Sequence, residues 1–277
     1  MQTVTTLIEL CAARRALPEP VGLVPTMGFL HAGHISLVQR ARAECASVAV
    51  SIFINPTQFG PNEDLAQYPR NLPRDLALLK AAGADLVWTP TPEGMYPPGY
   101  QTWVEVAGLT KGLEGEVRPG HFRGVATIIS KLFNAVEPDK AYFGQKDAQQ
   151  AAVIRQMVKD LDFLVDIVIC PIVREPDGLA MSSRNVYLNP EERQAATMLF
   201  HALSAAKSAY DSGERNAEKL RALVREMVAT EPLAHLQYIS CADYDTLEEL
   251  QQVTGKSLLS MAVYLGKTRL IDNFVIG

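Results

Sequence analysis

The chain has 277 residues, 48% of them hydrophobic and 21% charged, and its formal net charge is −5. This composition is that of an ordinary globular protein with one large or two modest domains, and the negative charge gives no support to binding of nucleic acid. No apolar run reaches the ~18 residues that span a bilayer, and the first residues lack the features of a signal peptide. The four cysteines lie far apart, which favours a reducing, cytoplasmic compartment. Because a spanning run and a signal peptide are both lacking, we also expect no membrane partner.

Strand and helix patterns alternate over the first half of the chain. Helical patterns at about 35–45, 73–82, 122–136 and 147–160 lie between apolar runs typical of buried strands, at 21–24, 48–54, 85–88, 141–143 and 164–169. This alternation predicts a parallel, Rossmann-like sheet. The stretch from Pro90 to Gly120 is rich in proline and glycine, and it predicts a long functional loop with one strand at 102–106.

The pattern changes after Val173. Two polar helical patterns at about 190–212 and 216–229 are followed by strand patterns at 235–242, 257–265 and 269–276. We therefore predict an α/β protein in which residues 1–173 form a Rossmann-like parallel-sheet domain and residues 174–277 form a smaller α+β C-terminal domain. A connection that contains glycine and proline makes the smaller domain a candidate lid.

The most informative motif is Pro25-Thr26-Met27-Gly28-Phe29-Leu30-His31-Ala32-Gly33-His34. It places His31 and His34 where a predicted strand passes into a predicted helix. Helix N-termini favour anions, and imidazoles there can donate hydrogen bonds to phosphate oxygens that gain charge in a transition state. A pattern this short also occurs by chance in polar loops, so its interpretation depends on the rest of the chain.

Polar motifs follow two further predicted strands. Asn55 and Gln58 follow the second strand, and their amides can bind substrate oxygens or simply form a β-turn. The segment Gly144-Gln145-Lys146-Asp147 opens a helix, where the glycine lets backbone approach a phosphate and Lys146 supplies positive charge; an exposed helix start is the alternative. Because the carboxyl ends of parallel strands share one edge of the sheet, the topology brings these motifs together.

Four other groups of polar residues have two interpretations each. Met181-Ser182-Ser183-Arg184 suits a triphosphate clamp, or an ordinary serine-capped turn. His121 and Arg123 form a basic cluster that either neutralises a substrate or caps a helix. Asp75 either holds Mg²⁺ through water or complements the start of a helix. The amides of Gln149 and Gln150 face either a cleft or water.

Five segments taken together resemble the pantothenate synthetase (pantoate–β-alanine ligase) family: PTMGFLHAGH, INPTQFG, RPGHFRGV, FGQKDAQQ and MSSRN. The two histidines alone indicate only the broad nucleotidyltransferase superfamily that includes class I aminoacyl-tRNA synthetases. The resemblance covers almost the whole chain and implies a homodimer with a Rossmann domain and a small lid. It also implies that ATP, with Mg²⁺, joins pantoate to β-alanine through a pantoyl-adenylate, releasing pyrophosphate and AMP.

The resemblance also implies roles for individual residues. His34 is the expected general acid, with His31 as its phosphate-binding partner and with Lys146 and Arg184 completing the catalytic set. Gln58, Gln150 and Asn55 form the expected substrate set, and Asp75 is the expected metal ligand. The expected ATP-binding residues are Met27, Gly28, Phe29, Leu30, His31, Ala32, Gly33, His34, Gly144, Gln145, Lys146, Asp147, Val173, Met181, Ser182, Ser183 and Arg184.

Two positions depart from the family pattern. Gln145 stands where the family commonly has Glu, and Arg74 precedes Asp75 where some members have a second acid, which weakens the expectation for the metal. Two other functions remain open at this stage. A nucleotidyltransferase would leave a stable nucleotidyl product, whereas a ligase should release AMP only when the amine is present. A nucleotide sensor would bind ATP without pyrophosphate exchange.

Overall fold

The computed structural model describes residues 1–61 and 63–277, which divide into two compact units. The first unit comprises Met1–Gln145 and Gln149–Pro171, and the second comprises Lys146–Ala148 and Ile172–Gly277. The expected boundary between residues 173 and 174 lies close to the division after Pro171. The assignment of Lys146–Ala148 to the second unit has no counterpart in the sequence pattern.

The first unit is built on a parallel sheet, as the alternation of strand and helix predicts. Its strands are β1 (Gln2–Val4), β2 (Val21–Thr26), β3 (Ser47–Ile52), β4 (Leu86–Trp88), β5 (Lys140–Gly144) and β6 (Asp166–Cys170). Their order across the sheet is β1-β4-β3-β2-β5-β6. Because β2 lies between β3 and β5, the polar segments that follow these three strands leave the sheet at neighbouring points of its carboxyl edge.

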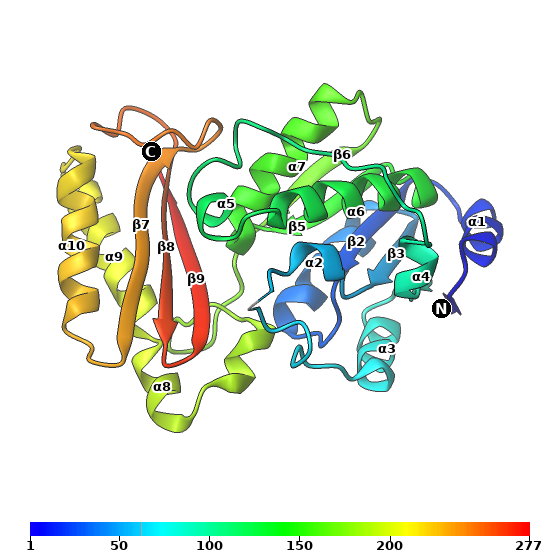
Figure 1. Cartoon of the computed structure of the whole chain (residues 1–277), viewed down its shortest axis with the longest axis horizontal. Helices are drawn as coiled ribbons and strands as arrows, with labels where there is room; N and C mark the ends of the chain where they lie inside the picture. The colour runs from blue at the N-terminus through cyan, green and yellow to red at the C-terminus, as the bar shows by residue number, and fades with distance from the viewer. Residues whose placement is uncertain (62) are drawn as a thin grey trace. The chain divides into compact units, whose positions relative to one another are not determined.

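Helices cover both faces of this sheet (Figure 1). One face packs against α1 (Leu7–Arg15), α6 (His121–Val136) and α7 (Ala148–Asp160). The other face packs against α2 (Ala32–Glu44) and α3 (Leu72–Ala81). Consecutive side chains of a strand point to opposite faces. Leu23 therefore packs on the face covered by α1, α6 and α7, and Val24 packs on the face covered by α2 and α3. Burial on both faces explains why β2 and β3 are almost continuously apolar.

Several elements of the first unit differ from the sequence prediction. Strand β1 and helix α1 were not expected, although Thr6 and Glu9 form a capping box at the start of α1. The strand predicted at 102–106 is wrong, because the Val104 N–H donates to Thr127 Oγ1 at 3.0 Å and not to a neighbouring strand. The remaining short elements are η1 (Pro56–Gln58), α4 (Pro92–Met95), α5 (Glu114–Val117) and η2 (Gln145–Asp147).

The second unit is a small α+β structure, which confirms the predicted class. Its antiparallel sheet consists of β7 (Ala234–Asp243), β8 (Ser257–Leu265) and β9 (Thr268–Ile276). Its helical elements are η3 (Ser183–Tyr187), α8 (Pro190–Ala195), α9 (Met198–Asp211) and α10 (Ala217–Ala229). Apolar side chains of α9 and α10 pack against this sheet in a separate core. The single helix predicted at about 190–212 is therefore two helices, interrupted at Ala196 and Thr197.

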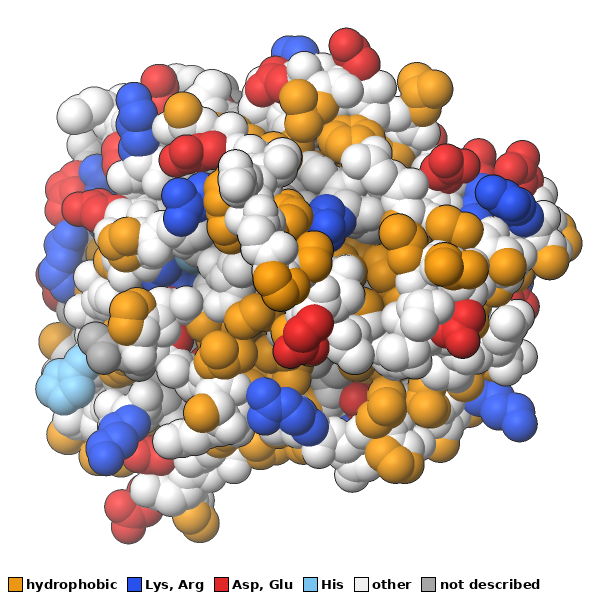
Figure 2. Space-filling model, turned by 45° about the vertical axis from the view of Figure 1, so that its right-hand side comes forward, with side chains coloured by type: hydrophobic (Ala, Val, Ile, Leu, Met, Phe, Trp, Pro, Cys, Tyr) orange, Lys and Arg blue, Asp and Glu red, His pale blue; other side chains and the backbone are white. Residues whose placement is uncertain are grey.

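Long apolar helices and basic surface patches are the features that membrane and nucleic-acid partners require. In the part of the chain that the structure describes, no helix has both the length and the apolarity needed to cross a bilayer. On the face shown in Figure 2, Lys and Arg side chains are interspersed with Asp and Glu side chains, and neither sign gathers.

Candidate nucleotide and substrate site

The loop between β2 and α2 turns sharply at Gly28. Both Gly28 (φ 84°) and Phe29 (φ 49°) adopt left-handed backbone conformations. A Cβ atom added to Gly28 would lie 3.0 Å from Ile52 Cγ2, so glycine is favoured there by space as well as by φ. Thr26 Oγ1 accepts a hydrogen bond from the Gly28 N–H at 3.2 Å and donates one to Ser51 O at 2.9 Å. The loop that carries the expected nucleotide residues is thus tied to the ends of two strands.

The first turn of α3 holds this loop from the other side. The carboxylate of Asp75 accepts the N–H of Phe29 at 2.7 Å and the N–H of Leu30 at 2.8 Å, one at each oxygen. Arg74 Nη1 donates to Leu30 O at 2.9 Å. Because the Asp75 side chain is only 1% exposed and both of its oxygens bind backbone, this geometry favours positioning of the loop over metal binding.

Apart from Asp75, no residue in the described part of the chain was expected to hold Mg²⁺, and no cluster of possible ligands is found there. Three or more His, Cys, Asp or Glu side chains that could surround a cation do not come together anywhere among residues 1–61 and 63–277. Protein-bound Mg²⁺ typically relies on one or two carboxylates together with substrate phosphates. The acid expected for that purpose, Asp75, is engaged by the backbone of Phe29 and Leu30. With both carboxylate oxygens engaged in this way, Asp75 does not fit as the ligand of a metal ion.

His31 and His34 form a capping box at the start of α2. His31 Nδ1 accepts from the Gly33 N–H at 3.1 Å, and His34 Nδ1 accepts from the His31 N–H at 3.3 Å. Each neutral ring therefore carries its hydrogen on Nε2, because Nδ1 is used as an acceptor. The ring centroids are 4.1 Å apart. The arrangement provides paired Nε2–H donors at a helix N-terminus, where the helix dipole favours an anion.

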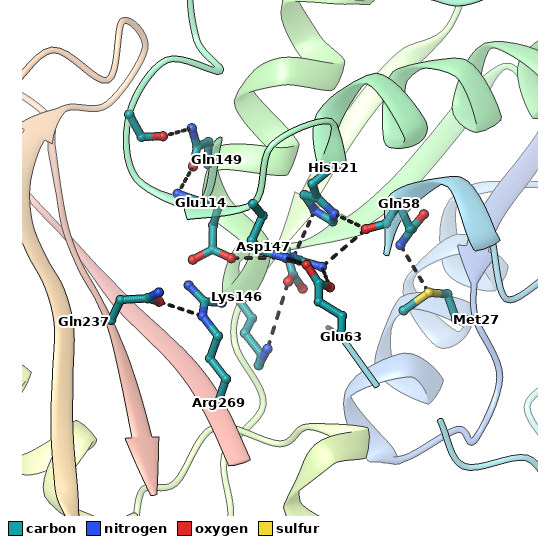
Figure 3. Close-up of polar contacts among 12 residues, drawn as sticks. Met27, Gln58, Glu63, Glu114, His121, Lys146, Asp147, Gln149, Gln237 and Arg269 are labelled. Atoms are coloured by element: carbon teal, nitrogen blue, oxygen red, sulfur yellow. Dashed lines mark hydrogen bonds and ion pairs between the residues drawn. The ribbon is translucent and has the colours of Figure 1, made fainter. Parts of the chain in front are cut away.

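The side chain of Gln58, at the end of η1, lies against the loop that follows β2. Its Oε1 accepts from Asn55 Nδ2 at 3.1 Å, and its Nε2 lies 3.2 Å from Met27 Sδ (Figure 3). Sulfur is a weak acceptor, so the Nε2 group keeps most of its capacity to bind a stronger one. The structure thus brings together two residues that lie 31 positions apart and that follow adjacent strands.

Asn55 lies behind Gln58 and is 1% exposed. Besides its bond to Gln58, its Nδ2 donates to Gly124 O at 3.1 Å. Its Oδ1 accepts from Thr57 Oγ1 at 2.9 Å and from the Tyr96 hydroxyl at 2.8 Å. Burial raises the pKa of Tyr96, so its hydroxyl remains a proton donor. Because these bonds use both hydrogens and both lone pairs of the amide, they favour positioning of Gln58 by Asn55 over contact with substrate.

The basic cluster expected at His121 and Arg123 is divided between two environments. His121 is buried, and its Nδ1 lies 2.8 Å from the carbonyl oxygen of Gln58. The Arg123 guanidinium lies over the Trp103 ring, 5.0 Å from its centroid. The two side chains therefore do not form one site for neutralising a substrate. His121, the first residue of α6, instead contacts Gln58 at the end of η1.

The start of α7 separates two glutamines that the sequence could not distinguish. Gln149 is buried, where its Oε1 accepts from the Glu114 N–H at 2.9 Å. Its Nε2 donates to Leu109 O at 2.8 Å and to Gly112 O at 2.9 Å (Figure 3). Gln149 therefore supports the loop before α6 and faces neither a cleft nor water. Gln150 is partly exposed one position later, after β5 has ended at Gly144 beside β2.

In the second unit, Val173 and Met181 form the base of a hairpin. The Met181 N–H donates to Val173 O at 3.0 Å. Within the hairpin, Arg174 makes a bidentate ion pair with Asp272 of β9, at 2.7 and 2.9 Å. The guanidinium of Arg174 also lies over the rings of Phe200 and Phe274. These contacts fix the base of the segment that leads into the expected phosphate-binding serines.

Ser182, Arg184 and Lys146 are also placed within the second unit. Ser182 caps η3, because its Oγ accepts from the Arg184 N–H at 3.2 Å. The serine turn considered from the sequence is thus present. The Lys146 side chain is 20% exposed, with Nζ 4.0 Å from Asp147 Oδ1, and the Lys146 carbonyl accepts from Asn273 Nδ2 at 2.9 Å. The backbone of Lys146 is therefore anchored to β9.

Comparison with known proteins gives one consistent result. The model of the pantoate-beta-alanine ligase family matches residues 1–275. The pantothenate synthetase of Roseiflexus castenholzii is 60% identical over 276 residues, which cover 100% of this chain and 99% of the relative. That of Herpetosiphon aurantiacus is 61% identical over 277 residues, with 100% of each covered.

Solved structures of similar proteins agree with the sequence comparison. Pantothenate synthetase from Thermus thermophilus superimposes with a TM-score of 0.95 at 48% identity, with 99% of both chains covered. A pantoate-beta-alanine ligase from Francisella tularensis, complexed with beta-gamma ATP and beta-alanine, has a TM-score of 0.82 at 35% identity. That comparison covers 99% of this chain and 97% of the other.

Proposed function

We propose, from the premise that the chain belongs to the pantoate–β-alanine ligase family, that its ligation of pantoate to β-alanine proceeds through a pantoyl-adenylate and releases pyrophosphate and AMP. The observation that carries this proposal is the pair His31 and His34, each with Nδ1 engaged at the start of α2. Their Nε2–H groups suit a phosphate that gains negative charge. The relative from Francisella tularensis was solved with an ATP compound and β-alanine, which agrees with ATP as the activating substrate.

The first step activates a carboxylate that is otherwise a poor acyl donor, because its leaving group would be oxide. A carboxylate oxygen of pantoate attacks the α-phosphorus of ATP, and the bond from that phosphorus to the bridging oxygen breaks to release pyrophosphate. We assign His34 as the Nε2–H hydrogen-bond donor that stabilises the leaving phosphate, with His31 beside it, and Lys146 and Arg184 as further phosphate binders. Positioning and charge stabilisation are the main contributions that phosphoryl chemistry needs from a protein.

The second step forms the amide bond. The amine of β-alanine attacks the acyl carbon of the mixed anhydride, the bond to the AMP oxygen breaks, and the nitrogen loses a proton to solvent. AMP is a far better leaving group than oxide, so no acyl-enzyme is required. Exclusion of water matters in this step, because water would hydrolyse the adenylate.

We assign the binding of pantoate to Gln58 and Gln150. An amide binds hydroxyl and carboxylate oxygens without forming a strong ion pair. Asn55 and Asp75 then act by positioning, as their buried hydrogen bonds indicate. Replacing Gln58 or Gln150 with Ala should raise the KM for pantoate far more than the KM for ATP, and equal increases in both constants would contradict this assignment. Mg²⁺ remains a prediction as a partner of ATP, and no step is assigned to a metal held by the protein.

One experiment distinguishes the proposed reaction from the alternatives. The protein is supplied with ATP, Mg²⁺ and pantoate, and pyrophosphate and AMP are measured with and without β-alanine. We expect pyrophosphate in an amount close to that of the enzyme when the amine is absent, and continuous release of pyrophosphate and AMP when it is present. A stable nucleotidyl product would indicate a nucleotidyltransferase. ATP binding without pyrophosphate would indicate a nucleotide sensor.

A further inference from the structure

The first turn of α6 packs against η1, the short helix that ends at Gln58. Gly124, one helical turn after His121, faces the backbone of η1 directly. A Cβ atom added to Gly124 would lie 2.5 Å from Thr57 O and 2.7 Å from Gln58 N, distances that no side chain tolerates. Glycine at this position therefore lets η1 pack against the helix, and Asn55 Nδ2 closes the same contact by donating to Gly124 O.

The ring of His121 contacts the main-chain carbonyl of Gln58 in the same region. Its Nδ1 lies 2.8 Å from Gln58 O, and its Nε2 lies 3.2 Å from Arg118 Nη1 (Figure 3). A carbonyl oxygen only accepts and a guanidinium only donates, so Nδ1 must carry the hydrogen and Nε2 must accept. The contacts therefore select the neutral Nδ1–H tautomer. His121 is only 8% exposed, which shields this arrangement from water.

Arg118 is itself held in place by acids. Its Nε and Nη2 donate to the two carboxylate oxygens of Glu63 at 2.9 and 2.6 Å, and its Nη1 lies 3.6 Å from Glu114 Oε2. Burial lowers the pKa of His121 to about 4 and the charge of Arg118 lowers it too, while the Gln58 carbonyl and the charges of Glu114 and Glu63 oppose this change. The ring is therefore neutral at pH 7, as the hydrogen bonds require.

We propose that His121 is a positioning residue for the ligation. Its Nδ1–H holds the main-chain carbonyl of Gln58, and its Nε2 is fixed by Arg118. The side-chain amide of Gln58 is thereby presented to substrate in one orientation. This inference rests on the substrate role proposed above for Gln58. It assigns the RPGHFRGV segment to the geometry of the substrate residue and not to direct neutralisation of a ligand.

Two amide substitutions provide a matched test. In His121→Asn, the side-chain nitrogen takes the place of Nδ1 and can donate to Gln58 O. In His121→Gln, the amide instead takes the place of Nε2, contacts Arg118 and does not reach Gln58 O. We expect His121→Gln to raise the KM for pantoate about tenfold, the effect of one lost hydrogen bond, with the KM for ATP almost unchanged. We expect His121→Asn to remain close to the unsubstituted protein. Equal behaviour of the two variants would overturn the proposal.

Two further measurements separate this inference from the function on which it rests. If Gln58→Ala leaves the KM for pantoate unchanged, the substrate role of Gln58 fails, whatever His121 does. Nitrogen-15 NMR of the unsubstituted protein reports the tautomer of His121 directly and needs no variant to fold. At pH 7 we expect a protonated Nδ1 and a bare Nε2; the opposite tautomer or an imidazolium would overturn the proposal even if the kinetics agreed.

Discussion

At the scale of single residues, the expected active-site histidines have both a structural and a chemical role. His31 and His34 use Nδ1 to satisfy N–H groups that a helix start leaves without partners. The same bonds fix the hydrogen on Nε2, the atom proposed to meet phosphate. The local requirement of the helix thus sets the tautomer that the chemistry requires, and a substitution at either residue affects stability and catalysis by separate routes.

His34→Asn separates these two roles. The Asn side-chain oxygen can accept the His31 N–H as His34 Nδ1 does, but the variant lacks the Nε2–H. We expect a thermal midpoint close to that of the unsubstituted protein and a loss of pyrophosphate release of roughly 10²–10³-fold, the usual effect of losing one transition-state donor. His34→Ala serves as the control that loses both roles. Near-normal pyrophosphate release by a folded His34→Asn variant would refute the assignment of His34 as the donor to the leaving phosphate.

Asp75→Asn tests positioning of the loop against metal binding. The substitution leaves one acceptor oxygen for Phe29 and Leu30 and places an NH₂ group against the other N–H. We expect the free energy of unfolding to fall by about 2 kcal/mol, because a charged acceptor is lost in a buried position. We also expect lower ligase activity that added Mg²⁺ does not restore. Recovery of activity at high Mg²⁺ would instead favour the metal role expected from the sequence.

At the scale of elements, the starts of three helices shape the candidate site. Helix α2 presents the histidines, the first turn of α3 holds their loop through Asp75, and the first turn of α6 supports η1 through His121 and Gly124. Each contact joins a helix start to a segment that follows a strand of the parallel sheet. Hydrogen bonds and packing therefore hold the carboxyl edge of the sheet where Gln58 and His34 emerge, which suits a site that positions reactants.

The buried His121 predicts a specific loss of stability in acid. Its pKa is 6.5 in the unfolded chain and about 4 in the folded protein. As the pH falls from about 6.5 to about 4, the unfolded chain takes up a proton that the folded protein does not, so the folded state loses about 3 kcal/mol from this group. Below about pH 4 the folded protein is protonated as well, and the loss stops growing.

Chemical denaturation between pH 4 and pH 8 measures this contribution. His121→Asn, which has no titratable group at this position, is the reference, because carboxylates that do not interact with residue 121 titrate in both proteins and cancel in the difference. Burial raises the pKa of Glu63, but the hydrogen bonds and charge of Arg118 outweigh this effect and lower it overall. A stability difference that stays constant across this pH range would show that His121 is not held neutral.

At the scale of the whole molecule, the chain carries its expected functional residues on two compact units. His34 and Gln58 belong to the first unit, and Lys146, Ser182 and Arg184 belong to the second. The base of the hairpin before Ser182 is anchored by Arg174 and Asp272, so any change in order is expected beyond it. The lid role of the second unit and the homodimer both remain predictions, and light scattering would test the latter.

Hydrogen exchange tests whether nucleotide orders the segment from Ser182 to Asn185. If Arg184 binds phosphate, a charge-assisted contact should favour a single conformation of this segment. We expect slower exchange of its backbone amides with saturating ATP and Mg²⁺, and little change at Arg174 and Asp272, whose ion pair anchors the hairpin. Arg184→Ala is the control that should abolish the protection. Identical exchange with and without ATP would contradict the lid hypothesis but not a fixed phosphate contact of Arg184.

The sequence by itself determined the class of fold and the edge of the sheet that carries the expected site. Apolar runs and helical periodicity are local properties, so β2, β3, β5 and the helices after them were predicted to within a few residues. The parallel topology then placed the segments at His31, Gln58 and Gly144 at one edge of the sheet. The structure shows in addition that the strands before them are neighbours. The resemblance of five short segments identified the family, which the comparisons confirm.

The tertiary structure alone decided what the supporting polar residues do. Asp75, Asn55, Gln149 and His121 each have a possible role as ligands in the sequence, but each binds a backbone atom of a residue that lies 35 to 69 positions away. Residue type and spacing cannot show whether a buried oxygen meets a substrate or a distant backbone N–H. That depends on which segments the packed helices bring together, because a buried polar group requires a partner wherever the fold places it.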